Sequence, residues 1–322
     1  MISRRTLLAL IAGTGGLAAV PAWAQSFPNR PIRLIVPFPA GGPTDVMARL
    51  IAQRLSATLG QIVVENRPGG GSTLGAKAVA LAEPDGHTIL IGTAGSVAIG
   101  PALFKNIGYD PLKSFAPVAM LANVPYVLIV SPKAPFKTIP ELLAYAKANP
   151  GRLTFGAPNG AQPHLLIELF KTTTRADIVL VPYKGASTVI TDTMGGQIDG
   201  GFETTSVLLG HLRERTLRGL AVTSPMRLPY LPDIPTMVES GVAEFVASSW
   251  SGILAPAGTA PEIIGKLRAE IIAGLRSSDM TARLETLGAQ ASFITREEFA
   301  AFLAAENRRW GELVVATGAK PE

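Results

Sequence analysis

The chain has 322 residues, of which 16% are charged, and a formal net charge of +5; it contains no cysteine. The missing cysteines exclude disulfides, thiolate catalysis, cysteine-based metal sites and a lipid anchor on an N-terminal cysteine. The positive charge is small for this length, and no cluster of Lys and Arg interleaved with aromatic residues is present, which argues against nucleic-acid binding. The length is sufficient for two domains.

The first 24 residues have the organisation of an export signal. An Arg-Arg pair at positions 4 and 5 precedes a short apolar run, Leu7–Val20, and Ala22-x-Ala24 offers a small-x-small cleavage site. The run is shorter than the roughly 20 residues of a membrane span, which favours a cleaved signal peptide over an anchor. The arginine pair also resembles a twin-arginine signal, so the export route stays open. We therefore expect a soluble protein in the periplasm, cleaved near Ala24.

Strand-like apolar runs alternate with helical patterns along the first third of the chain. The patterns predict, in order, a strand at Ile32–Phe38, a helix with Met47, Ile51, Leu55 and Leu59 on one face and Gly60 at its end, a strand at Ile62–Glu65, a helix at Thr73–Ala82 and a strand at Thr88–Gly92. Continuous apolar strands between helices indicate a parallel sheet that is covered on both faces.

The same alternation resumes after a proline-rich passage. It predicts strands at Val127–Ser131, Leu153–Gly156, Ile178–Pro182, Ile198–Phe202 and Leu217–Thr223, with helices at Pro140–Ala148, Pro163–Phe170 and Ser187–Met194. After one more extended run, Trp250–Pro256, the chain is predicted to be helical to its end, with apolar stripes such as Ile263, Leu267, Ile271 and Leu275, and Phe299 and Leu303.

This order of elements predicts two α/β domains, of which the first is discontinuous. Residues 25–124 and 245–322 would form domain 1, and residues 125–244 would form domain 2. The chain would then cross between the domains twice, near residues 123–127 and 244–250. A double crossing makes a hinge, and a hinge between two lobes leaves a cleft that can close on a ligand.

Four loops follow strands of this pattern and precede helices. They are residues 39–45, 92–96, 156–164 and 182–187, each of which combines small residues with free backbone N–H groups. Open α/β sheets bind ligands beyond the carboxyl ends of their strands, close to helix N-termini. Two of the loops fall in each domain, so the sequence predicts a small anion held between two halves.

Structural alternatives exist for the candidate residues of the first domain. Asp45 lies where an acid complements the helix dipole whatever the ligand. Gly41 and Gly42 could simply turn the chain, although two adjacent glycines before a helix favour a close approach of the ligand. Thr93 and Ser96 could contact the ligand or only cap the next helix.

The candidates of the second domain carry alternatives too. His164 lies at a helix start, where a structural role is the more common one, and Lys184 is typical of a solvated side chain. Glu203 follows an apolar strand and could line a pocket. Trp250, in the last extended run, favours a role in the hinge or the core over stacking on a ligand.

Motifs of catalysis are absent from the sequence. The segment Gly70–Lys77 approaches a phosphate-binding loop, but Ala76 stands where that motif requires lysine. No Gly-x-Ser-x-Gly nucleophile elbow occurs. The three histidines, His87, His164 and His211, are far apart in sequence and belong to no zinc-binding pattern. A hydrolase remains an unfavoured alternative.

Several ordered motifs resemble one known family. They are VPFPAGGPTDVMARLIA, VENRPGGGSTLGAKAVA, PDGHTILIGTAG, VPYKGAS, MGGQIDGGFE, LAVTSPMRLPYLPDIPTMVESG and APAGTAPEIIGKL. From about Phe27 to the C-terminus, the chain resembles the Bug family, the periplasmic substrate-binding receptors of tripartite tricarboxylate transporters. The resemblance implies an α/β, two-lobed, type II periplasmic-binding-protein fold with a ligand cleft between the lobes. It also implies no enzymatic activity, no cofactor or metal, an organic carboxylate as ligand, and a two-subunit membrane permease as partner.

The resemblance also implies which residues bind the ligand. The family holds a carboxylate with backbone groups and ordered water at two loops of domain 1. By position, these loops contain Phe38, Ala40, Gly41, Gly42 and Asp45, and then Thr93, Ala94, Gly95 and Ser96. The second lobe would contribute Asn159, Gly160, Ala161 and His164, together with Tyr183 and Lys184, and we add Glu203 as a candidate for the pocket wall.

The chain departs from the family pattern in two places, which affects the expected ligand. Residues 156–162 replace a run rich in Ser and Gly, so hydroxyl donors are lost and Asn159 is gained; Glu203-Thr204-Thr205-Ser206 replaces an Asp-Asn-Leu-Pro-like stretch. If Glu203 faces the cleft, it disfavours a second carboxylate, because two close anions repel each other. A monocarboxylate, or one with a hydroxyl or amine at its far end, then fits better than citrate. A sensor for a membrane signalling protein is the alternative role.

Overall fold

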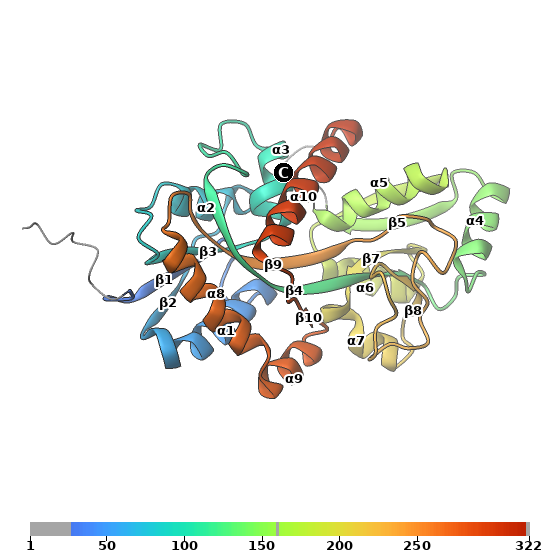
Figure 1. Cartoon of the computed structure of the whole chain (residues 1–322). Helices are drawn as coiled ribbons and strands as arrows, with labels where there is room; N and C mark the ends of the chain where they lie inside the picture. The colour runs from blue at the N-terminus through green and yellow to red at the C-terminus, as the bar shows by residue number, and fades with distance from the viewer. Residues whose placement is uncertain (1–26, 159–160, 320–322) are drawn as a thin grey trace, which may run out of the picture.

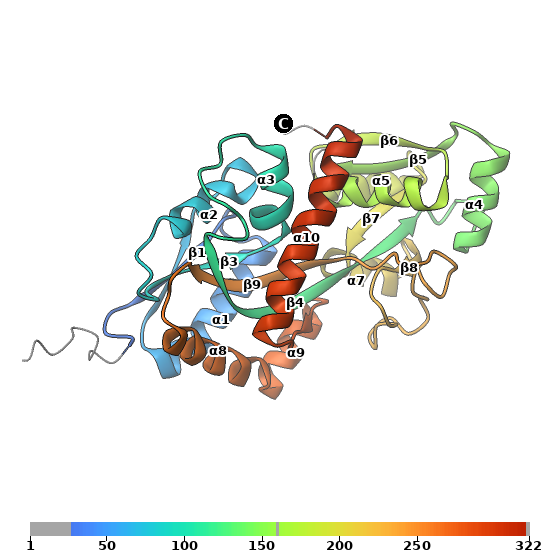
Figure 2. The same cartoon turned by 45° about the horizontal axis from the view of Figure 1, so that its top comes forward.

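The computed structural model describes residues 27–158 and 161–319, so the signal peptide predicted at residues 1–24 lies outside the described part. The protein has a two-lobed α/β fold (Figure 1). The lobes are joined by two long strands that run side by side through the middle of the molecule, and the last helix crosses the same region (Figure 2).

The first lobe is built on a parallel three-stranded unit. It contains β1 (Ile32–Val36), α1 (Pro43–Leu59), β2 (Ile62–Asn66), α2 (Thr73–Ala80) and β3 (Thr88–Gly92), and the C-terminal elements α8 (Pro261–Leu275), α9 (Ser278–Thr286), β10 (Gln290–Ala291) and α10 (Arg296–Thr317) return to it. Strand β1 pairs in parallel with both β2 and β3. The predicted apolar face of α1 is buried, and Gly60 ends this helix with a positive φ of 71°.

The second lobe repeats the alternation of strands and helices. It contains α4 (Ile139–Ala148), β5 (Leu153–Pro158), α5 (Gln162–Thr174), β6 (Ile178–Tyr183), α6 (Ala186–Gly195), β7 (Gly200–Thr204), α7 (Thr205–Arg213) and β8 (Arg218–Val222). Strand β5 pairs in parallel with β6 and β7. The predicted elements of this region are present, but α7 was not predicted.

Two antiparallel strands, β4 (Phe115–Val130) and β9 (Ser248–Pro256), connect the lobes. The expectation of a purely parallel sheet is therefore wrong: the strand order is β2-β1-β3-β9-β4-β7-β5-β6, and β4 and β9 run against their neighbours. The reason lies in the connectivity, because β4 leads out of the first lobe and β9 leads back into it. The first half of β4 was not predicted, since Pro117 and Pro125 make it look like a loop.

Strand β4 changes its partners along its length. Its residues up to Pro125 pair with β9, whereas Tyr126–Val130 pair with β7 and β8. This change of partner lies within the predicted crossing at residues 123–127, and the second predicted crossing, 244–250, includes the start of β9. The division into domain 1 (25–124 and 245–322) and domain 2 (125–244) stays a prediction.

Short helical segments follow β2 and β3 in the first lobe. Gly95–Ile99 forms a π-helical turn, η3, which continues directly into α3 (Gly100–Leu103), and Gly70–Ser72 forms a 3₁₀ turn, η2, before α2. π-Helical turns are rare and are frequently found at functional sites. None of these segments was predicted from the apolar periodicity, because each is too short for the pattern to repeat over several turns.

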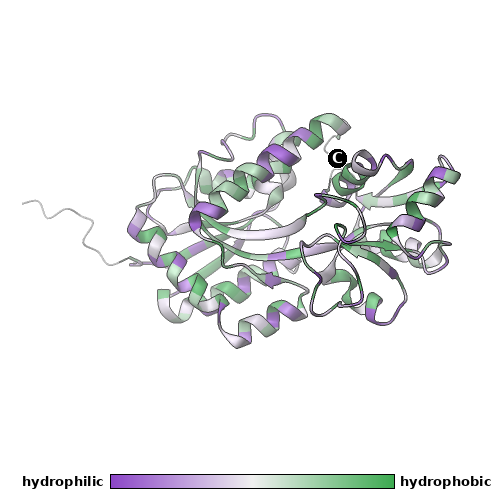
Figure 3. Ribbon diagram, turned by 45° about the vertical axis from the view of Figure 1, so that its right-hand side comes forward, coloured by the Kyte–Doolittle hydropathy of each residue, from purple (hydrophilic) through white to green (hydrophobic). Residues whose placement is uncertain are grey.

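The core is apolar at the strands and their covering helices, as the hydropathy colouring shows (Figure 3). One cluster joins β1, β3 and β9 to α1 and α8 in the first lobe, and another lies under α6 and α7 in the second. Trp250 of β9 is 2% exposed and donates its indole N–H to Glu306 of α10 (2.8 Å). Trp250 is thus a core residue of the strand that joins the lobes, which was the favoured interpretation.

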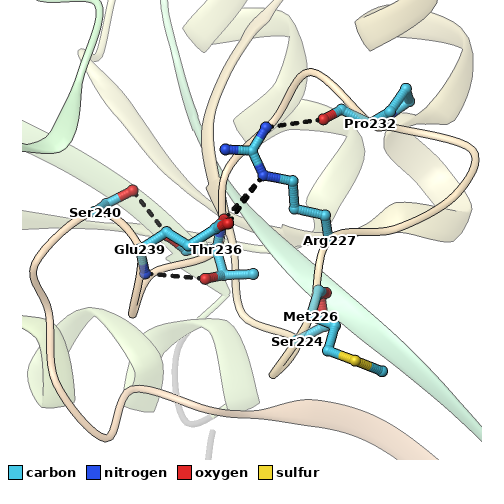
Figure 4. A network of polar contacts seen from close by, with 7 residues as sticks. All are labelled: Ser224, Met226, Arg227, Pro232, Thr236, Glu239 and Ser240. Atoms are coloured by element: carbon cyan, nitrogen blue, oxygen red, sulfur yellow. Dashed lines mark hydrogen bonds and ion pairs between the residues drawn. The ribbon is translucent and has the colours of Figure 1, made fainter.

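A long loop, residues 223–241, follows β8 and is cross-linked by polar contacts (Figure 4). Arg227 donates its Nε–H to both carboxylate oxygens of Glu239 (3.1 and 3.0 Å) and an Nη1–H to the carbonyl of Pro232 (3.1 Å). Glu239 also accepts a bond from the backbone N–H of Thr236 (2.7 Å). These contacts tie the two arms of the loop together and give it a defined shape without regular secondary structure.

No helix within the described residues is both long enough and apolar enough to cross a membrane.

Candidate functional site

A cavity of about 840 Å³ lies between the two lobes. Its walls are contributed by the two loops of the first lobe, by η2, η3 and α3, by the joining strands, and by the starts of α5 and α7 in the second lobe. The lining residues are Phe38, Pro39, Ala40, Gly41, Gly42, Pro43, Thr44, Gly71, Thr93, Ala94, Gly95, Ile99, Gly100, Leu103, Val124, Ala161, Gln162, Thr204, Ser206 and Ser249. This volume is within the usual range of small-molecule sites.

Helix N-termini border this cavity, and charged side chains do not, within the part of the chain that the structure describes. None of the described residues that line it is Asp, Glu, Lys, Arg or His. Helices α1, α5 and α7 begin there: their N-cap residues Gly42, Ala161 and Thr204 all line the cavity, and none makes a side-chain cap. The free N–H groups of a helix start, together with its macrodipole, favour an anion.

The capping of the other helices makes this arrangement informative, with one qualification. Helices α4, α9 and α10 begin away from the cavity, and Thr138, Ser277 and Thr295 cap them with their side chains. Helices α2, α6 and α8 also lack such a cap, although their N-cap residues do not line the cavity. What distinguishes the cleft is therefore the convergence of three uncapped helix starts from both lobes.

Asp45 supports the first loop from behind and is not among the lining residues. It is 2% exposed and accepts hydrogen bonds from the N–H of Gly41, from Arg49 Nε and from Asn66 Nδ2, each at 2.9 Å. Asn66 also donates to the carbonyl of Phe38 (3.1 Å). The bond from Arg49 is the main cause that lowers the pKa of Asp45 to about 2. The carboxylate thus fixes the loop whose backbone faces the cavity.

The two glycines of this loop differ in their backbone requirements. Gly41 has a φ of +82°, which L side chains rarely adopt, whereas Gly42 has an ordinary extended conformation (φ −76°). A Cβ on Gly42 would meet only the carbonyl of Pro39, at 3.6 Å. The backbone conformation therefore favours glycine at position 41. At position 42 the backbone would accept other residues, but a side chain there would occupy space in the cavity.

The second loop of the first lobe divides into lining and supporting residues. Thr93, Ala94 and Gly95 line the cavity. Ser96 is fully buried; its hydroxyl accepts from the N–H of Thr93 and donates to the carbonyl of Thr93, both at 2.9 Å. Ser96 lies inside η3, whose N-cap Ala94 makes no side-chain cap, so the hydroxyl closes the turn at Thr93 and does not cap the helix. A Cβ on Gly95 would lie 2.7 Å from Ser72 Oγ, so this position has no room for a side chain.

Most of the predicted residues of the second lobe that the structure describes are not among the lining residues of the cavity. Ala161 lines it, while Asn159 and Gly160 lie outside the described residues. His164 is 7% exposed inside α5, and burial lowers its pKa. Tyr183 donates its hydroxyl to Asp192 (2.7 Å), and burial together with this contact raises the pKa of Tyr183 to about 12. Lys184 is exposed and is absent from the lining.

Glu203 is buried beside the cavity without lining it. The residue is 4% exposed, and its Oε1 has no hydrogen-bond partner within the described part of the chain. Burial raises its pKa to about 7. In β7 it pairs with Val127, so its side chain lies on the sheet face that carries the cluster under α6 and α7, while the next residue, Thr204, reaches the cavity. A carboxyl group near half protonation at neutral pH exerts less repulsion on an anion than a full charge would.

Several lining residues were not predicted, and each has a physical reason. Thr204 and Ser206 belong to a strand-to-helix junction like that at residues 39–45, but α7 itself was missed. Gly71 belongs to the glycine-rich segment that was tested only as a phosphate loop. Val124 and Ser249 lie on the strands that join the lobes, and no local pattern marks them. The local feature that could have identified Thr204 and Ser206 from the sequence is the start of α7 directly after a strand.

Gln162 connects the second lobe to both joining strands. Its Oε1 accepts a bond from the Tyr126 hydroxyl of β4 (3.0 Å), and its Nε2 donates to the carbonyl of Ser248 in β9 (3.0 Å). Both functions of the amide are thus engaged, while the residue still lines the cavity. Gln162 positions the start of α5 relative to the hinge.

A two-lobed α/β protein, with an uncharged cleft onto which helix starts of both lobes converge, has the architecture of a type II periplasmic binding protein. The family model of the tripartite tricarboxylate transporter family receptors matches residues 47–319. The chain belongs to this family, and the resemblance to Bug receptors that the sequence motifs indicated is confirmed.

Individual relatives agree with this assignment. Protein BugT of Bordetella pertussis is 40% identical over 317 residues, which cover 98% of this chain and 97% of that protein. An R. palustris protein solved with adipate is 36% identical, with a TM-score of 0.77 over 92% of this chain and all (100%) of that one. MatC from Rhodopseudomonas palustris, solved with bound malate, is 34% identical, with a TM-score of 0.73 over 89% of this chain and 100% of that one.

Proposed function

We propose that this protein is a periplasmic receptor that captures a small organic carboxylate in the cleft between its lobes. It would deliver that carboxylate to the membrane permease subunits of a tripartite tricarboxylate-type transporter. The observation that carries the proposal is the convergence of α1, α5 and α7, whose uncapped N-termini all begin at one cavity. Each such terminus stabilises an anion by about 0.3–1 kcal/mol when exposed and by up to about 2 kcal/mol when partly buried.

The ligand-binding residues of this proposal come from both lobes. Phe38–Gly42 and Thr93–Gly95 would hold one carboxylate with backbone groups, and the glycines allow the close approach. Thr204 and Ser206 would offer hydroxyl donors from the second lobe. Asp45 and Ser96 act indirectly, because they fix the two loops. The absence of cationic residues from the described lining favours ligands that are bound by hydrogen bonds and dipoles.

The ligand class follows from the far side of the cavity. The relatives solved with adipate and malate hold dicarboxylates. Glu203 gives less reason to disfavour a second carboxylate than the sequence indicated, because it is absent from the lining and has a pKa of about 7. We therefore include dicarboxylates, together with monocarboxylates that carry a polar far end, in the proposed ligand class.

The cellular part of the proposal rests on the family and on the predicted export signal. The matched family consists of receptors of tripartite transporters, which supports a permease partner and a role without catalysis. The Arg-Arg pair, the short apolar run and the Ala22-x-Ala24 site support export to the periplasm. Intact mass of the protein from a periplasmic extract measures the cleavage directly, and a full-length chain in the inner membrane would contradict it.

The ligand is tested by a thermal-shift panel on refolded, ligand-free protein. The panel contains adipate, malate, citrate, aromatic and aliphatic monocarboxylates, amino acids, sugars and cationic amines. A ligand at a hundredfold excess over Kd stabilises the folded state by about 2.7 kcal/mol, which raises the melting temperature by several degrees. We expect a shift with at least one carboxylate. A shift with sugars or amines and with no carboxylate refutes the proposal.

A further inference from the structure

A second contact between the lobes lies outside the ligand cavity, at the carbonyl oxygen of Gly288. Gly288 follows α9 and has a φ of +62°. Two hydroxyls donate to its carbonyl: Thr205 Oγ1 at 2.7 Å and Tyr230 Oη at 2.8 Å. Both donors belong to the second lobe, Thr205 as the first residue of α7 and Tyr230 as part of the loop at 223–241.

The two sides of this contact belong to different cores. Leu284 and Ala289, on either side of Gly288, are buried in the cluster that contains β1, β3 and α1. Tyr230 packs instead against the cluster under α6 and α7, which contains Leu208 and Leu228. The hydrogen bonds at Gly288 therefore join two different apolar clusters, one in each lobe.

Position 288 requires glycine for two reasons: the positive φ, and the lack of space for a Cβ beside α7. A Cβ there would lie 2.9 Å from the backbone N of Ser206 and 2.9 Å from the carbonyl carbon of Thr205. Real Cβ atoms do not approach backbone so closely, so any side chain would push α7 away from α9. The lobes thus touch backbone to backbone at this point.

The contact is connected directly to the ligand cavity. Thr205 stands between Thr204 and Ser206, which both line the cavity and whose hydroxyls lie 2.8 Å apart. Thr205 also donates to the carbonyl of Pro125 (3.2 Å), in the part of β4 where the partners change. A displacement at Gly288 would therefore move the second-lobe wall of the cavity.

Tyr230 is held for this contact by the cross-linked loop. Arg227 and Glu239 tie the two arms of the loop together on either side of Tyr230, as Figure 4 shows for the neighbouring residues. A cavity of about 210 Å³, lined by Pro229 and Tyr230 on one side and by residues of α9 and β10 on the other, lies next to the bond. This cavity interrupts the packing between the loop at 223–241 and the segment around α9 and β10, so the Tyr230 hydroxyl bridges the two at its edge.

We propose that Tyr230 and Thr205 form an interlobe strut on Gly288 that positions the second-lobe wall of the cavity and so sets ligand affinity without contacting the ligand. This inference rests on the proposed carboxylate-binding function. The strut assigns a role to the loop at 223–241, which lies outside the cavity lining. Burial raises the pKa of Tyr230, so its hydroxyl stays a proton donor over the working pH range.

The test compares Tyr230→Phe and Thr205→Val with a matched control, Thr193→Val. Thr193 is also fully buried and donates its hydroxyl to a backbone carbonyl, that of Val189 (2.7 Å), but donor and acceptor both lie in α6. All three variants lose one hydroxyl donor. Only the first two lose an interlobe bond, so a general loss of stability is separated from a loss of positioning.

The first measurement uses ligand-free protein and hydrogen exchange by mass spectrometry. We expect faster exchange at the start of α7 and around Gly288 in Tyr230→Phe and Thr205→Val, and no change there in Thr193→Val. Unchanged exchange in both strut variants overturns the strut, whatever the protein binds.

The second measurement titrates adipate and malate by calorimetry. One net hydrogen bond corresponds to a factor of about 2 to 10 in an equilibrium constant, so each strut variant is expected to weaken binding by about that factor, with a faster off-rate. Wild-type affinity in both strut variants overturns the inference. If no carboxylate binds the wild-type protein, the proposed function fails, and the exchange measurement still decides whether the strut exists.

Discussion

Replacing Asp45 with asparagine is expected to lower stability and ligand affinity together, because this carboxylate holds the loop in front of α1. An asparagine side chain at this position would keep the volume and lose the charge. Its amide oxygen can take the place of Oδ2, which accepts from both Gly41 and Arg49, but its NH2 group would then face the Nδ2 donor of Asn66, which Oδ1 accepts in the wild-type protein. The pKa of Asp45 falls from 3.8 to about 2. At about 1.4 kcal/mol for each pKa unit, this shift corresponds to about 2 kcal/mol of folding stability at neutral pH.

The exposed partner reduces that value. The side chain of Arg49 is 53% exposed, so solvent screens part of the interaction, and a loss of about 1–2 kcal/mol is the better expectation. This loss corresponds to a fall of a few degrees in melting temperature. Because the pKa of an acid is lowered on folding, its contribution is complete above the unfolded pKa near 3.8 and disappears as the pH falls towards 2.

The assay is urea unfolding of the wild-type and variant proteins between pH 3 and pH 8, with Asp279→Asn as the matched control. Asp279 also lies in the first turn of its helix and also pairs with an arginine four residues later, but its side chain is 72% exposed. We expect a constant difference for Asp45→Asn above pH 5, a shrinking one below pH 4, and almost none for Asp279→Asn. Equal effects of the two variants at pH 7, or an undiminished Asp45 effect at pH 3, would refute the reasoning.

Three further outcomes are expected. Gly42→Val should abolish the thermal shift by carboxylates while circular dichroism stays unchanged, because valine can adopt the backbone of Gly42 but fills the cavity; an unchanged shift would place the ligand elsewhere. Glu203→Gln should stabilise the protein by up to about 3 kcal/mol above pH 7 and not at all below about pH 4.5, because a raised pKa makes the ionised form destabilising in the folded state; equal gains at both pH values in urea unfolding would contradict this. Gln162→Leu should weaken carboxylate binding more than it lowers the melting temperature, because it releases α5 from both joining strands; calorimetry beside thermal unfolding compares the two effects, and wild-type affinity would show that the amide is not needed.

Much of the first lobe follows from local patterns in the sequence. The apolar stripe of α1, the glycine that ends it and the strand before it each depend on residues that are close in sequence. The loops at 39–45 and 92–96 could be placed for the same reason, since a strand end, two glycines and a helix start are local signals. Apart from Asp45 and Ser96, the predicted residues of these loops lie in the short segments Phe38–Gly42 and Thr93–Gly95, which line the cavity.

Only the tertiary structure decided which polar groups face the cavity and which support it. Asp45, Ser96 and Tyr183 have side-chain or backbone partners that use their polar atoms, and those partners were not visible from the sequence. Glu203 and Thr204 are adjacent in one strand, so their side chains lie on opposite faces of the sheet. Thr204 lines the cavity, whereas the carboxyl group of Glu203 is buried on the other face.

Contacts between residues that are distant in the chain could not be predicted from the sequence, for a physical reason. The sequence by itself determined the alternation of strands and helices, because periodicity and turn residues are local properties of the chain. The antiparallel crossing of β4 and β9, the engagement of Gln162 with both of these strands, and the strut on Gly288 join residues that are far apart in the chain, such as Phe115 and Pro256. Such contacts are selected by the packing of whole elements against one another, and that packing is decided only when the chain is folded.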